Sequence, residues 1–162
     1  MNTDKNLKEA FAGESQANRK YLAFAKKAEE DGFEGAAKLF RAAAEAETIH
    51  AHSHLKALNG VKSTAENLKE GITGETFEFE NMYPPMIEEA KKEGRSDAQR
   101  SFHFASAAEK VHASLYKDAL ENLDKKEVVD YFLCPVCGNV EKNLAPEKCS
   151  ICGAKKQVFI KY

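Results

Sequence analysis

All four cysteines of this 162-residue chain lie near its C-terminal end, in two Cys-x-x-Cys pairs that are each followed by glycine. The pairs are Cys134 with Cys137 and Cys149 with Cys152, and eleven residues separate them. Two such knuckles bring four thiolates around one tetrahedral metal ion. Zinc and iron both accept a four-cysteine site, and the spacing leaves both open. Two disulfides are a weaker alternative, because we expect a cytosolic protein.

The segment around these cysteines differs in composition from the rest of the chain. From Val128 onward, Val, Tyr, Phe and Ile alternate with Gly and Pro, which is typical of short strands and tight turns. This segment has 35 residues, fewer than the roughly 40 that usually fold without a disulfide or a metal. We therefore predict two domains, residues 1–127 and residues 128–162, the second stabilised by a metal ion.

The first predicted domain is rich in Ala, Glu, Lys and Leu, and its only prolines are Pro84 and Pro85. This composition favours helix, with a bend at the two prolines. Gly32 and Gly60 are typical of helix ends, and a capping box that begins at Ser96 is typical of a helix start. The four long helices are predicted at residues 3–30, 34–58, 75–93 and 96–124.

The connection between the second and third of these helices is predicted to be long. Ser63 begins a capping box for a short helix, which we expect to end at Gly71 and Gly74. Residues 59–74 then join two antiparallel helix pairs, as in bundles with one long crossover connection. The prediction is a mainly helical protein built on an antiparallel four-helix bundle.

Carboxylates and imidazoles interrupt the apolar face that each long helix should bury. The first helix has one glutamate there, the second and fourth each have Glu-x-x-His, and the third begins with two glutamates three residues apart. The residues concerned are Glu14, Glu47, His50, Glu75, Glu78, Glu109 and His112.

Five carboxylates cannot be buried together without a compensating cation, because even one unpaired buried charge costs several kcal/mol. No Lys or Arg occupies these positions, so we predict a pair of divalent metal ions, for which oxygen and imidazole ligands favour iron or manganese. A solvated contact within the helix is the alternative for one Glu-x-x-His alone, and a solvent-facing position is the alternative for Glu78. Tyr21 and Tyr83 are either core aromatics or hydrogen-bond partners of a ligating carboxylate.

These residues together resemble the rubrerythrin family over the full length of the chain. The resemblance rests on AFAGESQA at 10–17 with Tyr21, FRAAAEAE at 40–47 with His50, GETFE at 74–78 followed by MYP at 82–84, the later Glu-x-x-His, and the two knuckles. It implies a ferritin-like four-helix bundle with one long crossover connection and a non-haem di-iron site. A small rubredoxin-like domain of strands and turns, with one iron bound by the four cysteines, is implied after the bundle.

The resemblance also implies a role for each ligand. Glu47 and Glu109 would bridge the two irons, Glu14 would bind one iron, and Glu75 with His112 would bind the other. Glu78 and His50 would be alternative ligands that one iron exchanges between the oxidised and the reduced state. No ligand position of the family is missing from the chain.

The implied activity is that of a peroxidase that protects against oxidative stress. It would reduce hydrogen peroxide to water, with electrons that return through the rubredoxin-like iron from a reduced rubredoxin or an NAD(P)H-dependent reductase. An iron-oxidising and storage protein of the ferroxidase type is one alternative, and an electron carrier with a structural zinc ribbon is another. We expect a homo-oligomer, with a dimer as the first expectation, and electron transfer to the site of a neighbouring subunit.

Charge and hydropathy exclude other classes of function. Twenty-four basic and 26 acidic residues leave a formal charge of −2, which does not favour nucleic acid as a partner. No stretch reaches the roughly 18 apolar residues of a membrane span, and the first residues do not resemble a signal peptide. We therefore expect a cytoplasmic protein without a membrane partner.

Overall fold

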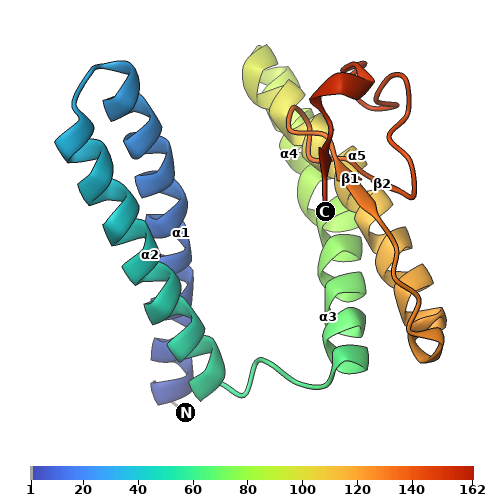
Figure 1. The fold of residues 1–162 in the computed structure, drawn as a ribbon, viewed down its shortest axis with the longest axis horizontal. Helices are drawn as coiled ribbons and strands as arrows, with labels where there is room; N and C mark the ends of the chain where they lie inside the picture. Colours follow the sequence, from blue (N-terminus) through green and yellow to red (C-terminus); the bar gives the residue numbers. More distant parts are fainter. Residues whose placement is uncertain (1) are drawn as a thin grey trace. The chain divides into compact units, whose positions relative to one another are not determined.

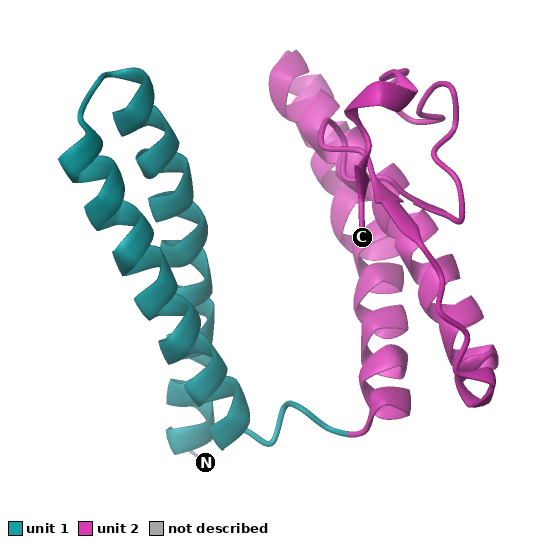
Figure 2. Ribbon diagram, viewed as in Figure 1, with its two compact units in different colours: residues 1–62 teal, residues 63–162 magenta. Residues whose placement is uncertain are grey.

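The computed structural model describes residues 2–162, and contacts divide the chain into two compact units (Figure 2). One unit ends at Lys62 and the other comprises Ser63–Tyr162. The chain is mainly helical, as predicted, and ends in a small three-stranded sheet (Figure 1). The predicted domain boundary after residue 127 stays a prediction, since the division by contacts falls elsewhere.

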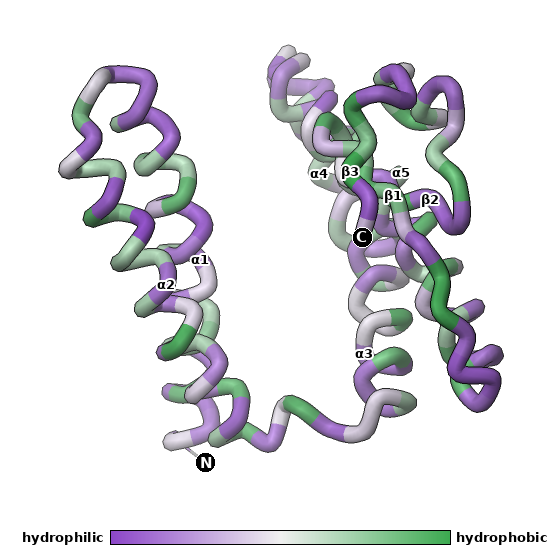
Figure 3. The backbone as a smooth tube through the Cα atoms, viewed as in Figure 1, coloured by the Kyte–Doolittle hydropathy of each residue, from purple (hydrophilic) through white to green (hydrophobic). Residues whose placement is uncertain are grey.

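The first unit is a hairpin of two long helices, α1 (Asn2–Glu30) and α2 (Glu34–Ala57). A tight turn joins them, in which Gly32 has a φ of 82° and thus the left-handed conformation that glycine adopts without strain. Both helices alternate hydrophobic and hydrophilic residues along their length (Figure 3), as amphipathic helices do.

The two helices of the hairpin pack through small side chains. The buried positions are alanines, which let the helix backbones approach closely. They are Ala25, Ala28, Ala37, Ala44 and Ala51. The amide Nδ2 of Asn18 in α1 donates to the carbonyl oxygen of Ala44 at 2.7 Å and to the hydroxyl of Thr48 at 2.9 Å, which fixes the register of the hairpin.

The second unit begins with a continuous helical stretch, α3 (Thr64–Phe77), the π-helical turn η1 (Glu78–Met82) and α4 (Tyr83–Lys92). The predicted capping box at Ser63 is present, but the predicted break at Gly71 and Gly74 is wrong. A Cβ at Gly71 would lie 3.2 Å from the ring of Tyr116, so this glycine serves close helix packing instead of ending a helix. Only residues 58–63 separate α2 from α3, so the predicted long connection over residues 59–74 is wrong, because most of that stretch is part of α3.

The π-helical turn η1 has its cause in the two prolines that follow it. Pro84 and Pro85 have no N–H to donate, so the regular ladder of hydrogen bonds cannot continue through them. The N–H of Tyr83 instead reaches the carbonyl of Glu78, five residues earlier. The turn therefore accommodates the prolines, and the predicted bend takes the form of a wider turn.

Helix α5 (Ser96–Glu121) returns along α3 and α4 and ends at the short 3-10 turn η2 (Leu123–Lys125). The capping box predicted at Ser96 is wrong, because Ser96 already lies inside the helix and Arg95 occupies the cap without a side-chain hydrogen bond to the backbone. Asp97 places a negative charge in the first turn of the helix, where acidic side chains are favourable, and it forms an ion pair with Arg95 at 2.9 Å.

The chain after residue 130 forms a small antiparallel sheet of strand order β2-β1-β3. The strands are β1 (Tyr131–Leu133), β2 (Val140–Lys142) and β3 (Ile160–Lys161), and the 3-10 turn η3 (Lys156–Val158) precedes the last strand. Strand β2 contacts α5, and Lys142 forms an ion pair with Asp118 of that helix. Among residues 2–162, no helix combines the length and hydropathy that crossing a bilayer requires.

Candidate metal centres

The first unit brings three of the predicted ligands together. Glu14 of α1 and Glu47 and His50 of α2 each place one ligand atom within 4.8 Å of the others. The Nδ1 atom of His50 lies 2.8 Å from Oε2 of Glu47, and 55% of the His50 side chain is exposed. We call these three residues the first triad, and their ligand atoms are close enough to bind one metal ion.

The second unit repeats this arrangement. Glu75 of α3 and Glu109 and His112 of α5 form the second triad, with ligand atoms again within 4.8 Å of one another. The Nδ1 atom of His112 lies 2.6 Å from Oε2 of Glu109 and 3.7 Å from Oε1 of Glu75. Each triad thus combines one glutamate of one helix with the Glu-x-x-His pair of another helix.

The electrostatics of the second triad fit a bound cation. Burial raises the pKa of Glu75 to about 7, and the neighbouring Glu109 carboxylate contributes to this rise by repulsion and by sharing a proton. The hydrogen bond with His112 lowers the pKa of Glu109 and raises that of His112. A divalent ion would replace the shared proton and relieve the repulsion between the two carboxylates, so this donor set fits a metal.

The other predicted residues lie outside the two triads. Glu78, the first residue of the π-helical turn, has a pKa that burial and the charge of Glu109 raise, so it lies within electrostatic range of the second triad. The pKa of Tyr83 is raised by burial and by Glu78, Glu109 and Glu75. Tyr21 packs against Phe40, with ring centroids 6.1 Å apart.

Tyr116 lies beside the second triad, although the sequence predicts no role for it. It follows His112 by one helical turn on α5, and burial and the charges of Glu75 and Glu109 raise its pKa. Its spacing of four residues from His112 is the signal that could have identified it. Its ring packs against Gly71, which holds it beside the second triad.

The four cysteines surround one point, as predicted. The Sγ atoms of Cys134 and Cys152 are 3.6 Å apart, and those of Cys137 and Cys149 are 3.5 Å apart. These distances are too long for disulfides and close to the about 3.8 Å between sulfurs of a tetrahedral site with metal–sulfur bonds of about 2.3 Å. The cluster therefore has the geometry of a four-cysteine metal site.

Backbone N–H groups stabilise negative charge on these sulfurs. Burial opposes ionisation of Cys149, but the N–H groups of Cys152 and Ile151 outweigh it and bring its pKa to about 7. Burial raises the pKa of Cys137 instead. The amide of buried Asn139 lies 3.8 Å from Sγ of Cys149 and donates to Glu141 at 2.8 Å. Hydrogen bonds to sulfur are one of the factors that set the reduction potential of an iron–cysteine site.

The knuckle that holds Cys134 and Cys137 lies directly against the second triad. Phe104 packs on the cysteine cluster, and a Cβ on Gly138 would lie 3.9 Å from that of Ala108. One further turn along the same face of α5, Nε2 of His112 is 2.9 Å from the carbonyl oxygen of Gly138. With Nε2–H as donor, Nδ1 is left free to bind a metal on the side of the two glutamates.

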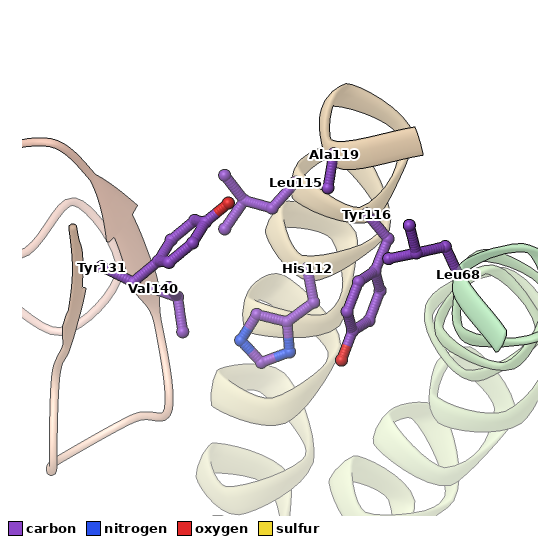
Figure 4. Close-up of a pocket in the computed structure, with 7 residues that line it drawn as sticks. All are labelled: Leu68, His112, Leu115, Tyr116, Ala119, Tyr131 and Val140. Atoms are coloured by element: carbon purple, nitrogen blue, oxygen red, sulfur yellow. The ribbon is translucent and has the colours of Figure 1, made fainter. Parts of the chain in front are cut away.

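A cavity of about 380 Å³ opens beside this contact (Figure 4). Its wall combines the ring of His112 and apolar side chains of α3 and α5 with Tyr131 and Val140 of the sheet. The cavity is therefore mostly apolar, with the imidazole as one of its few polar groups.

Metal binding to the second triad is expected to weaken as the pH falls from about 8 to about 6. A metal ion must displace the proton that Glu75 holds with a pKa of about 7, so the apparent affinity should fall about tenfold per pH unit below that value. The raised pKa of His112 acts in the same direction, whereas Glu109 is ionised throughout. Titration of the apo-protein with Co²⁺, followed by absorbance, measures this affinity.

The matched control for this titration is Glu70→Gln, which changes an exposed glutamate of the same helix. This variant should keep the affinity and the pH dependence of the unaltered protein. An affinity of the unaltered protein that does not change between about pH 8 and about pH 6 would contradict the expected proton displacement.

The chain is similar to known proteins over both predicted domains. The family model described as Rubrerythrin matches residues 5–120, and the one described as Rubrerythrin, rubredoxin-like domain matches residues 132–160. Nigerythrin of Nitratidesulfovibrio vulgaris is 39% identical over 99% of this chain and 86% of its own length. Rubrerythrin-2 of Clostridium acetobutylicum is 34% identical over 94% of this chain and 92% of its own length.

Solved structures of nigerythrin are similar as well. The fully reduced, all-ferrous state has a TM-score of 0.62 at 39% identity, and the mixed-valence state has a TM-score of 0.61 at 40% identity. Each alignment covers 99% of this chain and 86% of the nigerythrin chain.

Four long helical segments, two carboxylate–histidine triads and a cluster of four cysteines define a di-iron carboxylate protein of ferritin-like fold with a rubredoxin-like domain. The chain belongs to the rubrerythrin family. The predicted fold class and the two predicted kinds of iron site, carboxylate–histidine and four-cysteine, are thereby confirmed.

Proposed function

We propose that this protein reduces hydrogen peroxide to water at a di-iron site formed by the two triads, with electrons supplied through the iron of the four-cysteine site. The donor would be a reduced rubredoxin or an NAD(P)H-dependent reductase of the rubredoxin type. The observation that carries this proposal is the hydrogen bond of 2.9 Å between His112 and the carbonyl of Gly138. It joins a ligand of the second triad to the knuckle that holds Cys134 and Cys137.

The reduction of one peroxide to two water molecules consumes two electrons and two protons. A pair of ferrous ions, when bound, would supply both electrons and act as a Lewis acid toward the peroxide. In the proposed assignment, Glu47 and Glu109 would be shared by the two metals, Glu14 would be held by one metal, and Glu75 with His112 would be held by the other. The chain itself contributes several carboxylate ligands, whose negative charge favours the ferric state. The hydrogen bond to the carbonyl of Gly138 fixes the orientation of the His112 ring.

His50 and Glu78 differ from the other proposed ligands and fit a role as alternatives. His50 is far more exposed than its neighbour Glu47, and Glu78 lies outside the second triad at a π-helical turn. Neutral imidazole suits the ferrous state, whereas a carboxylate suits the ferric state. We propose that His50 and Glu78 would be alternative ligands of one metal, the imidazole in the ferrous state and the carboxylate in the ferric state. Tyr83, whose pKa is raised by burial and by the charges of Glu78, Glu109 and Glu75, would stay protonated and donate to one of these carboxylates.

The alternative functions predict other properties of the four-cysteine site. Iron storage needs no returning electron, and a structural zinc ribbon cannot carry one, so neither explains why the knuckle contacts a ligand of the triad.

Metal analysis and anaerobic peroxide kinetics test the proposal. Three irons per chain are expected, with absorption of the iron–cysteine site that bleaches on reduction and returns on peroxide addition. Zinc in the knuckles with no reoxidation by peroxide would overturn it.

Replacement of His50 by alanine is expected to slow peroxide turnover roughly tenfold while two irons stay bound in the di-iron site. The reason is that Glu14 and the bridging carboxylates retain the metals, whereas the ferrous state loses its imidazole ligand. Steady-state peroxide reduction together with iron analysis measures both effects. His52→Ala, an exposed histidine of the same helix, is the control and should leave both unchanged. Unchanged kinetics in His50→Ala would remove the proposed role of this residue.

A further inference from the structure

Of the four cysteines, Cys152 is the one that solvent reaches most easily. The other three are buried, whereas Cys152 is partly exposed and Gly153, which follows it, is exposed. At the first pair of cysteines, by contrast, Gly138 lies against Ala108 of α5. Because electron transfer becomes slower with distance, a protein that reduces the four-cysteine site from outside should contact the loop that carries Cys152. We call this loop, residues 149–153, the outer knuckle.

Two lysines stand at the two ends of the outer knuckle, directly opposite each other. Lys148 precedes Cys149, Lys155 follows Gly153 by two residues, and the two lysines form an isolated antiparallel bridge. Both residues are exposed. Like charges at directly opposite positions are unfavourable, so the stability of the fold does not explain this arrangement. We call Lys148 and Lys155 the lysine pair.

The other charged side chains of this segment already have partners. Residues 128–162 contain five lysines and three carboxylates, whereas residues 1–127 contain 19 basic and 23 acidic residues, so the segment is basic on an otherwise acidic chain. Three ion pairs engage the remaining lysines, namely Lys142 with Asp118, Lys156 with Glu147 and Lys161 with Asp130. The third carboxylate, Glu141, accepts a hydrogen bond from Asn139. Within residues 2–162 the lysine pair has no ion-pair partner, so its two charges are available to another molecule.

Apolar side chains lie within both pairs of cysteines. Ile151 of the outer knuckle is partly buried and packs on the cysteine cluster. Val136, between Cys134 and Cys137, is 58% exposed. Because all four cysteines surround one point, both side chains belong to the surroundings of the same metal site. A few apolar contacts with charges at the rim are typical of the small interfaces that electron-transfer proteins form.

We propose that the outer knuckle and the lysine pair form the docking surface for the electron donor, and that this donor is a small carrier protein with carboxylates around its own redox centre. The inference rests on the proposed function in one respect, the entry of electrons through the four-cysteine iron. Attraction between the carboxylates and the lysine pair would increase the rate of encounter and turn the redox centre of the carrier toward Cys152. Each encounter passes one electron, which oxidises the carrier and reduces Fe³⁺ of the site to Fe²⁺, and no bond forms or breaks.

Reversal of both charges tests the docking surface, in the iron-loaded variant Lys148→Glu/Lys155→Glu without peroxide or oxygen. The probe is fully reduced flavodoxin, a small acidic electron carrier whose flavin absorption is distinct from that of the iron–cysteine site. Stopped-flow absorbance should show a second-order rate constant at least about tenfold lower in the variant at low ionic strength. The rate constant of the unaltered protein should fall as NaCl rises from about 20 to about 300 mM, and the variant should lose this decrease, because salt screens the attraction.

A neutral reductant and two further variants complete the test. Photoreduced deazariboflavin is small and uncharged, so it should reduce the variant and the unaltered protein at the same rate. Lys26→Glu/Lys38→Glu makes the same change in net charge on exposed positions of α1 and α2 and should keep the rate with flavodoxin. Lys148→Gln/Lys155→Gln removes the two charges without reversing them, and its rate should be intermediate. Iron content and circular dichroism show whether each variant is folded.

The outcomes separate the docking surface from the proposed function. An unchanged rate with flavodoxin in both variants of the lysine pair would overturn the docking surface. An equal loss of rate with flavodoxin and with deazariboflavin would overturn it too, because the lysine pair would then act on the reduction potential of the site and not on a partner. A rate with flavodoxin that depends on the lysine pair, in a protein that peroxide does not reoxidise, would support the docking surface and overturn only the proposed function.

Discussion

Replacement of Cys149 by serine is expected to abolish reductase-driven peroxide turnover and to spare a single turnover of chemically reduced protein. Cys149 is the buried thiol whose pKa the N–H groups of Cys152 and Ile151 hold at about 7, so it is readily ionised for a metal. Without it, the iron of the four-cysteine site is lost and electrons have no entry to the triads. Steady-state turnover should fall on the order of 100-fold or more, measured by NAD(P)H oxidation in the presence of peroxide and a reductase.

Two controls show whether loss of the electron-transfer path causes the expected loss of turnover in Cys149→Ser. Ser150→Ala, which changes the exposed neighbour in the same knuckle, should leave turnover unchanged. Zinc in place of iron in the unaltered four-cysteine site keeps the knuckles folded and cannot change oxidation state, so it should reproduce the loss. Full reductase-driven turnover by the zinc form would show that electrons reach the triads by another route.

Replacement of Glu109 by alanine is expected to reduce the iron content from about three ions per chain to about one. Glu109 is hydrogen-bonded to His112 and shares a proton with Glu75, so its loss removes the centre of the second triad. The apo-protein should keep its helix content, because alanine is a better helix former and because Glu75 loses the like charge that raises its pKa. Iron analysis and circular dichroism measure the two effects.

Glu121→Ala, at the exposed end of the same helix, is the matched control and should bind three irons. A Glu109→Ala protein that still holds a metal pair would show that Glu109 is not a bridging ligand. Loss of helix content together with iron would instead assign a structural role to the residue.

Much of the fold was predictable because the decisive signals are local. The Ser63 capping box, the left-handed glycine at 32 and the Cys-x-x-Cys knuckles each involve residues within a few positions of one another. Gly71 could not be interpreted in this way. Its role depends on Tyr116, 45 residues later, and a local rule that associates glycine with helix ends gave the wrong prediction.

In the candidate site, too, local features could be predicted from the sequence, whereas contacts between distant residues could not. Helical spacing alone predicts that the glutamate and the histidine of each Glu-x-x-His pair lie on one face of their helix, whereas the third member of each triad comes from another helix, which spacing does not identify. The contact between His112 and Gly138 joins residues 26 positions apart, and no periodicity indicates it. The structure places Gly138 against His112 of the same chain, and the expected electron transfer to the site of a neighbouring subunit stays a prediction.

The packing of the knuckle that holds Cys134 and Cys137 on α5 limits which fragments of the protein can be studied separately. Gly138 holds Nε2 of His112, and Phe104 of α5 packs on the cysteine cluster. A chain truncated after residue 127 would lose that acceptor, leave the imidazole free to rotate and expose an aromatic ring to water. The helices of such a fragment would therefore differ from those of the full chain. Replacing a cysteine, or the metal that the cysteines bind, removes the function of the four-cysteine site without removing the segment that packs on α5.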